Sequence, residues 1–138
     1  MILVDSNVII DVLHRDPEWY EWSLSHMIEA AALGKVFTTH VVLAETAPHY
    51  GSLSEFIARM GEMTIEVEPL SDAAAFRAGM AFLEYRRRHK DRQSVLADFI
   101  IGGHAQHLGA TILTRDPRFY RTYFPSVPLV TPSKDEND

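Results

Sequence analysis

The sequence predicts an α/β fold in which a mostly parallel sheet of four to five strands is covered by helices on both faces. Short β-branched or apolar runs alternate with longer helical segments, which is the order typical of parallel sheets. The 138 residues, 46% of them hydrophobic, can form the core of one domain. Cysteine is absent, which excludes a disulfide scaffold, thiol catalysis and cysteine-ligated metal sites.

The first half of the chain predicts two strands and several helices. The apolar run at 2–4 predicts a strand, and cap-forming residues at 5–7 precede a helix that begins near Val8. Segment 18–33 has a helical composition and is followed by Gly34, a common helix terminator. Residues 36–40 are β-branched and aromatic, so they predict a second strand. Further helices are expected at 41–47, before Pro48, and at 53–60.

The second half continues the alternation. Residues 64–68 alternate in polarity and predict a third strand, after which Ser71 or Asp72 can cap a long helix to about His89. Ser94 can cap a helix at 95–108, which Gly109 ends. A strand at 111–114, a short helix at 117–124 and an edge strand at 127–130 complete the order. We expect one domain over residues 1–131 and a disordered tail over 132–138.

Charge and hydropathy indicate the cellular location of the protein and the kind of partner it binds. The first apolar run ends at Asp5, before a signal peptide could form, and no apolar run is long enough to span a membrane. We therefore expect a cytoplasmic protein. The net charge is −6, yet residues 86–121 carry eight basic residues against three acidic ones. This asymmetry indicates a basic face for a polyanion, with a solvated, salt-bridged helix face as the alternative.

Four acidic residues stand where a parallel sheet would bring them together. Asp5 follows the first predicted strand, Asp116 follows the fourth, Glu45 lies on the helix after the second strand, and Asp98 lies one turn into an apolar helix. Ligands collect at the carboxyl ends of parallel strands. Converging carboxylates repel one another, and a divalent cation removes that conflict. Oxygen ligands of this kind suit Mg²⁺ or Mn²⁺, which can support hydrolysis of phosphodiesters.

Most of these acids also have a structural explanation. Asp5 could be only a helix cap, Asp116 only part of an Asp-Pro turn, and Glu45 only a surface residue. Asp11 we expect to be a solvated acid on its helix. His104 and His107 are three residues apart, but no third nitrogen or sulfur ligand is near in the sequence, so zinc is not expected.

Three segments, in this order and spacing, resemble the PIN-domain ribonucleases, and specifically the VapC-type toxins of type II toxin–antitoxin systems: ILVDSNVIIDVL, HVVLAE and SVLADFIIGGHAQHLGATILTRDPRFY. The resemblance implies a PIN-like three-layer α/β/α fold and an Mg²⁺- or Mn²⁺-dependent endoribonuclease. It implies catalytic roles for four acids, with the metal on Asp5, Asp98 and Asp116 directly and on Glu45 directly or through water. Asn7 would help to hold the site and Thr114 would orient the last acid. Gly102 and Gly103 depart from the small alanines usual in the family.

The resemblance also implies partners. The RNA backbone would meet a basic set made of Arg86, Arg87, Arg88, Lys90, Arg92, Arg115 and Arg118. A small antitoxin would lay an amphipathic segment between the helices at 18–33 and 53–60, giving a homodimer or a hetero-oligomer with the antitoxin. Two alternatives remain. A HAD-like phosphohydrolase would need a second Asp where Asn7 stands, and a non-catalytic PIN-like scaffold would bind RNA or protein without cleaving it.

Overall fold

Five parallel strands form the central sheet in the computed structural model, which describes residues 1–89 and 96–132. Their order across the sheet is β3-β2-β1-β4-β5, and every pair of neighbours is parallel. In chain order the strands are β1 (Ile2–Val4), β2 (Val36–Thr39), β3 (Glu66–Glu68), β4 (Thr111–Leu113) and β5 (Leu129–Val130). Since Val4 pairs with Leu113, the residues that follow β1 and β4 meet at one edge of the sheet.

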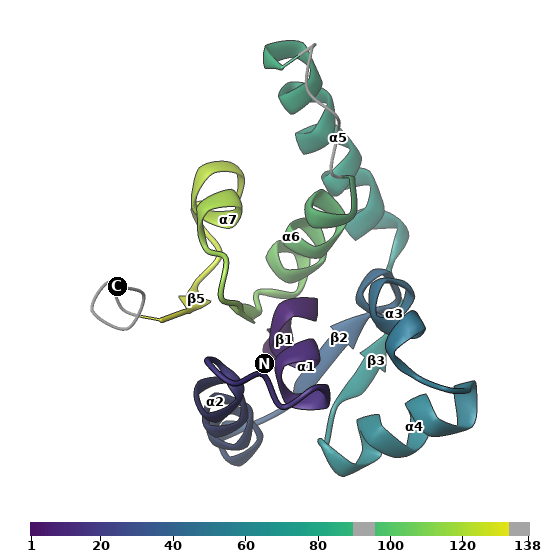
Figure 1. The fold of residues 1–138 in the computed structure, drawn as a ribbon. Coiled ribbons are helices and arrows are strands. Elements are labelled where there is room, and N and C mark those ends of the chain that lie inside the picture. Colours follow the sequence, from purple (N-terminus) through teal and green to yellow (C-terminus); the bar gives the residue numbers. More distant parts are fainter. Residues whose placement is uncertain (90–95, 133–138) are drawn as a thin grey trace.

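Helices cover both faces of this sheet, as predicted. Figure 1 shows α5, α6 and α7 on one side and α1, α2 and α4 on the other. Right-handed crossovers produce this division, because the strand order runs outward from β1 to β3 and then returns to β4. The helices are α1 (Ser6–Leu13), α2 (Tyr20–Leu33), α3 (His40–Thr46), the 3₁₀ turn η1 (Ala47–His49), α4 (Leu53–Glu62), α5 (Asp72–Arg88), α6 (Leu96–Leu108) and α7 (Arg118–Tyr123).

Side-chain caps and one backbone turn decide where several elements begin. Ser71 is the cap of α5, with its hydroxyl accepting from the Ala74 N–H. Thr39 ends β2 one residue earlier than predicted, because its hydroxyl caps α3 by accepting from the Val41 N–H. Strand β3 is shorter than the predicted 64–68, because Thr64 has a φ of 60° and still belongs to the turn after α4. The predicted cap Ser94 and the tail beyond residue 132 lie outside the described residues.

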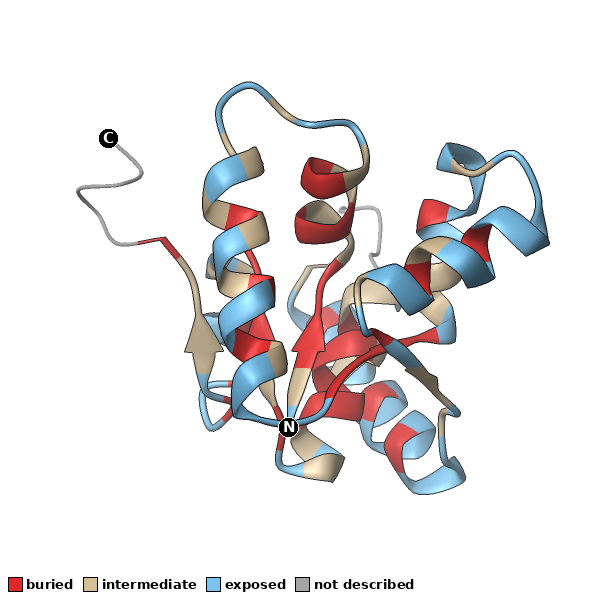
Figure 2. Cartoon of the chain, turned by 90° about the horizontal axis from the view of Figure 1, so that it is seen from below, coloured by how far each residue is buried: buried red, intermediate tan, exposed pale blue. Residues whose placement is uncertain are grey.

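The core lies between the sheet and the inner faces of the helices, where Figure 2 shows the buried residues gathered. Leu3, Phe37 and Ile112 of the three central strands are fully buried. Gly102 and Gly103 allow α6 to pack closely: a Cβ on Gly102 would lie 2.3 Å from the Phe124 ring, and one on Gly103 would lie 2.9 Å from Ala78 Cβ. Glycine in place of the alanines usual in the family therefore leaves room for Phe124 and Ala78.

Residues 1–89 and 96–132 contain no helix with the length and apolar character that crossing a membrane requires.

Candidate active site

Asp5 is the innermost residue of the candidate site. It directly follows β1, caps α1 by accepting from the Ser6 N–H at 2.8 Å, and is only 5% exposed. Its Oδ2 accepts hydrogen bonds from the Thr114 hydroxyl at 2.9 Å and from the Tyr120 hydroxyl at 3.0 Å. Burial raises the pKa of Asp5, and these three hydrogen bonds oppose the rise because they favour the carboxylate. The carboxylate is thus fixed in one orientation before any ligand arrives.

Thr114 and Asn7 hold the loop after β4 beside Asp5. The Thr114 hydroxyl accepts from Asn7 Nδ2 at 3.2 Å and from the Asp116 N–H at 3.1 Å. Asn7 Oδ1 in turn accepts from the Arg115 N–H at 3.1 Å. Both side chains therefore connect the loop after β4 to α1.

The other three acids approach Asp5 from three different elements. Asp98 comes from the first turn of α6 and Asp116 from the loop after β4, and both line a pocket of about 80 Å³ together with Asp5. Its remaining lining residues are Ser6, Asn7, Phe119 and Tyr120. Glu45 of α3 lies at the rim, where its Oε1 accepts from the Ser6 hydroxyl at 3.3 Å.

Electrostatic repulsion within this cluster is visible in the pKa values. Partial burial, followed by the charges of Asp5, Glu45 and Asp116, raises the pKa of Asp98 to about 6. Partial burial and the charge of Asp5 raise the pKa of Glu45. The four carboxylates thus lie close enough together to disfavour full ionisation, which is the condition that a cation relieves.

The donor set fits Mg²⁺ or Mn²⁺ better than a metal that needs a complete protein cage. Within the described ranges, no group of three or more His, Asp or Glu side chains is arranged so that it could hold a metal ion by itself. Mg²⁺, however, binds through one or two carboxylates and keeps several of its waters. Asp5, Asp98 and Asp116 line one small pocket, so one or two of them could bind such an ion directly, with Asp5 as the anchoring ligand.

Two residues of the site lack a clear signal in the sequence. Tyr120 lies on α7, which begins two residues after Asp116, and only this closeness in the sequence could have suggested that it lines the site. Ser6 adjoins Asp5 and joins it to Glu45, since its hydroxyl lies within hydrogen-bonding distance of both carboxylates.

The expectation that Asp11 is a solvated acid is wrong. Asp11 is 2% exposed, and its carboxylate binds Arg115 through Nε at 2.6 Å and Nη2 at 2.9 Å. Asn7 and Asp11 are four positions apart, so both lie on the face of α1 that contacts the loop after β4. Because Arg115 is paired with Asp11, we leave it out of the RNA-binding set.

The other candidate RNA contacts lie on helix surfaces. Arg86, Arg87 and Arg88 are exposed in the last turn of α5, which projects beyond the sheet in Figure 1, and Arg118 is exposed at the start of α7. One exposed ion pair involves this set, between Arg87 and Glu84 at 3.3 Å. Lys90 and Arg92 lie outside the described residues.

His104 has a structural environment. It is 1% exposed on α6, its ring packs against Phe37 at a centroid distance of 5.8 Å, and burial lowers its pKa. His107, by contrast, is exposed.

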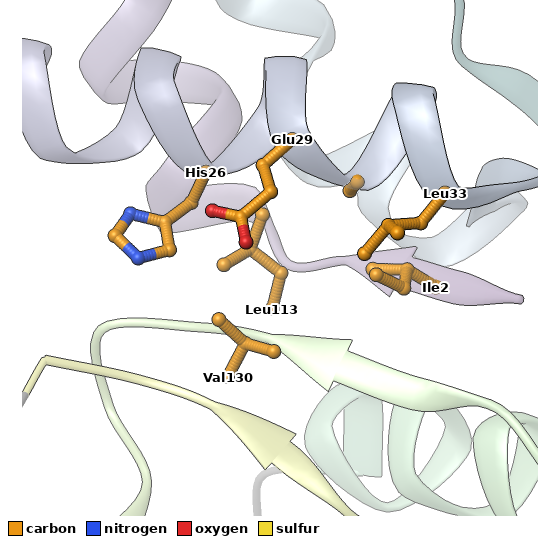
Figure 3. A pocket seen from close by; sticks show the side chains of 7 residues that line it. Ile2, His26, Glu29, Leu33, Leu113 and Val130 are labelled. Carbon is orange, nitrogen blue, oxygen red and sulfur yellow. The ribbon is translucent and has the colours of Figure 1, made fainter.

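A second hollow, of about 200 Å³, lies between α2 and the strands and shares no residue with the acidic pocket. Figure 3 shows side chains of α2 directed toward Leu113 and Val130 across it. The lining residues are Ile2, His26, Glu29, Ala30, Leu33, Leu113 and Val130. This surface is mostly apolar, so it offers no comparable cation site.

Solved structures with the same fold belong to toxin–antitoxin proteins. VapBC2 of Rickettsia felis, bound to a promoter DNA fragment, gives a TM-score of 0.70 at 18% identity, covering 96% of this chain and 100% of that one. DNA-bound VapBC of Salmonella typhimurium gives 0.68 at 21% identity, with coverage of 94% and 96%. VapC20 of Mycobacterium tuberculosis, a toxin that cleaves the sarcin–ricin loop, gives 0.62 at 18% identity, with coverage of 93% and 99%. At such identities the likeness shows the fold.

A comparison with curated proteins gives no significant match. The family model of the PIN domain matches residues 2–125, a span that contains all four acids and strands β1 to β4. This chain therefore belongs to the PIN-domain family, as its motifs predicted.

Proposed function

We propose that this PIN domain is an Mg²⁺- or Mn²⁺-dependent endoribonuclease and the toxin of a toxin–antitoxin pair. The observation that carries the proposal is the meeting of four carboxylates from separate elements at the carboxyl edge of the sheet, with mutual repulsion that a cation would relieve. Family membership supports nuclease chemistry, and the RNA-cleaving VapC20 with the same fold supports RNA as the substrate.

The chain's own residues would bind and orient the reacting groups. Asp5, held by three hydrogen bonds, would be the fixed ligand, and Asp98 and Asp116 would complete the cation site. Glu45, with Ser6, would act directly or through a water at the rim. A divalent cation bound there would neutralise the cluster and polarise a phosphate oxygen. Asn7 and Thr114 would keep the loop of Asp116 in register with Asp5.

The basic residues would bind the RNA backbone. Arg86, Arg87 and Arg88 are exposed at one helix end and Arg118 at another, so they can bind phosphates without a change of fold. Lys90 and Arg92 belong to the same basic segment of the sequence.

The test is cleavage of total RNA by the purified protein with Mg²⁺ or Mn²⁺, with excess chelator, and by the Asp5→Asn and Asp98→Asn variants. We expect RNA cleavage only by the unaltered protein with metal. We expect no hydrolysis of a chromogenic phosphate monoester, which a HAD-like enzyme would hydrolyse. Metal binding without RNA cleavage would favour the non-catalytic scaffold. Cleavage at full rate by both variants in chelator would exclude the proposed site.

Exposed apolar residues on α2 and α4 support the antitoxin proposal. Ile28 and Leu33 of α2 are 62% and 78% exposed, and Leu53 and Ile57 of α4 are 68% and 61% exposed. An amphipathic antitoxin segment would bury such side chains, and an Arg or Lys on it could pair with the acids. Because that cation would compete with the metal, each should weaken the binding of the other by the same factor.

Titration calorimetry with the product of the neighbouring gene, with and without Mg²⁺, tests this. Ile28→Ser and Ile57→Ser should weaken binding, whereas the matched control Phe76→Ser, on α5 at the opposite side of the sheet, should not. If the neighbouring product fails to bind, or binds without reducing cleavage, the toxin assignment fails and the nuclease assignment stands on its own test.

A further inference from the structure

Asp11 and Arg115 form the most buried ion pair in the described residues, and the nuclease chemistry proposed above gives neither of them a role. Asp11 Oδ2 accepts from Arg115 Nε at 2.6 Å and Oδ1 accepts from Nη2 at 2.9 Å, so the contact is two-pronged. Ser23 of α2 donates to the same Oδ2 at 2.7 Å, and the Arg115 Cζ lies 5.1 Å from the centroid of the Trp19 ring. Groups before and within α2 thus fix both partners.

The pair attaches the loop after β4 to α1 at a second point. Asn7 accepts the backbone N–H of Arg115 at 3.1 Å, and Asp11, one turn later on the same helix face, binds the Arg115 side chain. Arg115 stands between Thr114, which orients Asp5, and Asp116, which lines the acidic pocket. Holding Arg115 from two sides therefore fixes the path of the chain on which both neighbours depend.

The charges around the pocket explain why such a restraint is needed. Asp5 and Asp98 both experience the negative charge of Asp116, so electrostatic repulsion opposes the position of the exposed Asp116 beside them. Asp11 also neutralises Arg115, whose guanidinium could otherwise turn toward the carboxylates and compete with a metal cation. The pair therefore restrains the loop and adds no net charge to the site.

We infer that Asp11 and Arg115 act together as positioning residues that hold Asp116 in place for the reaction, and that Arg115 is not an RNA contact. This inference rests on the proposed nuclease function. It separates Arg115 from the exposed arginines of α5, which would bind substrate without shaping the site.

The test compares Asp11→Asn, Arg115→Gln and the double variant in single-turnover and steady-state RNA cleavage. We expect each single variant to lower kcat by about tenfold to a hundredfold, the effect of a small misplacement of a reacting group, with KM for RNA within about twofold. The double variant should be no slower than the slower single variant, because residues that act as one unit are not additive. The salt dependence of RNA binding should stay unchanged in all three.

A second readout needs no activity. In the metal-free protein, hydrogen exchange of the Arg115 and Asp116 amides should accelerate in both single variants. The two amides donate to Asn7 and Thr114, and these hydrogen bonds should open more often once the Arg115 side chain is released. Glu21→Gln and Arg77→Gln, at exposed residues on α2 and α5, are the matched controls and should change neither exchange nor kcat. If the single variants unfold, the apolar pair Asp11→Leu with Arg115→Met restores a packed core, and it should still show fast amide exchange and low kcat.

Three results would overturn the inference. A higher KM and a reduced salt slope in Arg115→Gln, with neither in Asp11→Asn, would make Arg115 an RNA contact. Normal kcat in folded Asp11→Asn would reduce the pair to a stabilising contact. Unchanged amide exchange in both single variants would remove the loop restraint, even if the unaltered protein cleaves RNA. Absence of cleavage by the unaltered protein would instead refute the proposed function and leave the exchange result to decide the inference.

Discussion

Replacing Asp98 by Asn should stabilise the metal-free protein and destroy its response to metal. The reason is the pKa of Asp98, which is raised from an ordinary value of 3.8 to about 6 by burial and by three neighbouring carboxylates. Between these two values the folded protein binds a proton that the unfolded chain has released. The stability of the unaltered protein therefore falls as the pH rises from about 4 to about 6, and the loss persists at higher pH.

The magnitude follows from the size of the shift. At about 1.4 kcal/mol per pKa unit, a change from 3.8 to about 6 corresponds to about 3 kcal/mol. Asp98 is only partly buried, and solvent screens its repulsions, so we expect about 1–2 kcal/mol. Asparagine has nearly the same shape and no charge, so the variant should gain this amount above pH 6 and almost nothing at pH 4. At roughly 3–5 °C per kcal/mol for a domain of this size, the gain is readily measurable.

Urea or thermal unfolding in chelator at pH 4, 5, 6, 7 and 8 would measure this, with Glu21→Gln as an exposed control that should show no such trend. Added Mg²⁺ should then reverse the order of stability. At a concentration about 100 times its Kd, a bound ligand stabilises the folded state by about 2.7 kcal/mol, a gain available to the unaltered protein and largely lost in the variant. A less stable Asp98→Asn in chelator at pH 8, or an equal Mg²⁺ response in both proteins, would refute this electrostatic account.

Three further predictions concern other parts of the molecule. Tyr120→Phe removes the hydroxyl that donates to Asp5 at 3.0 Å and should cost about 1–3 kcal/mol at pH 8 in urea unfolding, whereas Tyr20→Phe should be near neutral; equal costs would deny Tyr120 a special role. Gly102→Ala brings a Cβ to 2.3 Å from the Phe124 ring and should cost about 1–3 kcal/mol, whereas Gly61→Ala, with nothing within 4 Å, should gain up to about 1 kcal/mol; a stabilised Gly102→Ala would show that Phe124 can move aside. Replacing Arg86, Arg87 and Arg88 together by Ala should lower the salt slope of RNA binding by up to about three and leave the Mg²⁺-induced thermal shift intact; an unchanged slope would make these arginines an ordinary solvated face.

Much of the fold could be predicted because many helices and strands begin and end at residues that act locally. Ser71 capping α5, for example, depends on residues within one turn. Thr64 shows the limit: it is β-branched and polar–apolar alternation continues through it, yet its positive φ makes it part of a turn. The Thr64 N–H donates to the Gly61 carbonyl and the Ile65 N–H to the Met60 carbonyl, which is the helix-ending motif in which glycine is usual. A β-branched residue in the place of that glycine gives no sequence signal of the turn.

The candidate site likewise has a part that could be predicted from the sequence and a part that could not. Acids in apolar segments could be recognised from the sequence, because a buried carboxylate needs an explanation wherever it occurs. Asp11 was misread because its partner, Arg115, lies 104 positions away, and helix periodicity alone cannot say which distant cation faces a given turn. Arg115 was grouped with the RNA contacts for the same reason, since local charge counts include cations that are already neutralised.

The four acids come from four separate elements, and this has a consequence for synthesis of the protein on the ribosome. Thr114 lies 109 positions after Asp5, and Asp116 reaches the cluster only when β4 has paired with β1. A nascent chain that has emerged only as far as α5 carries Asp5 and Glu45 but has no assembled cluster. The acidic pocket is therefore complete only late in translation, and a chain that stalls before β4 lacks Thr114 and Asp116. For the proposed toxin, this order of assembly would delay activity until the fold is nearly complete.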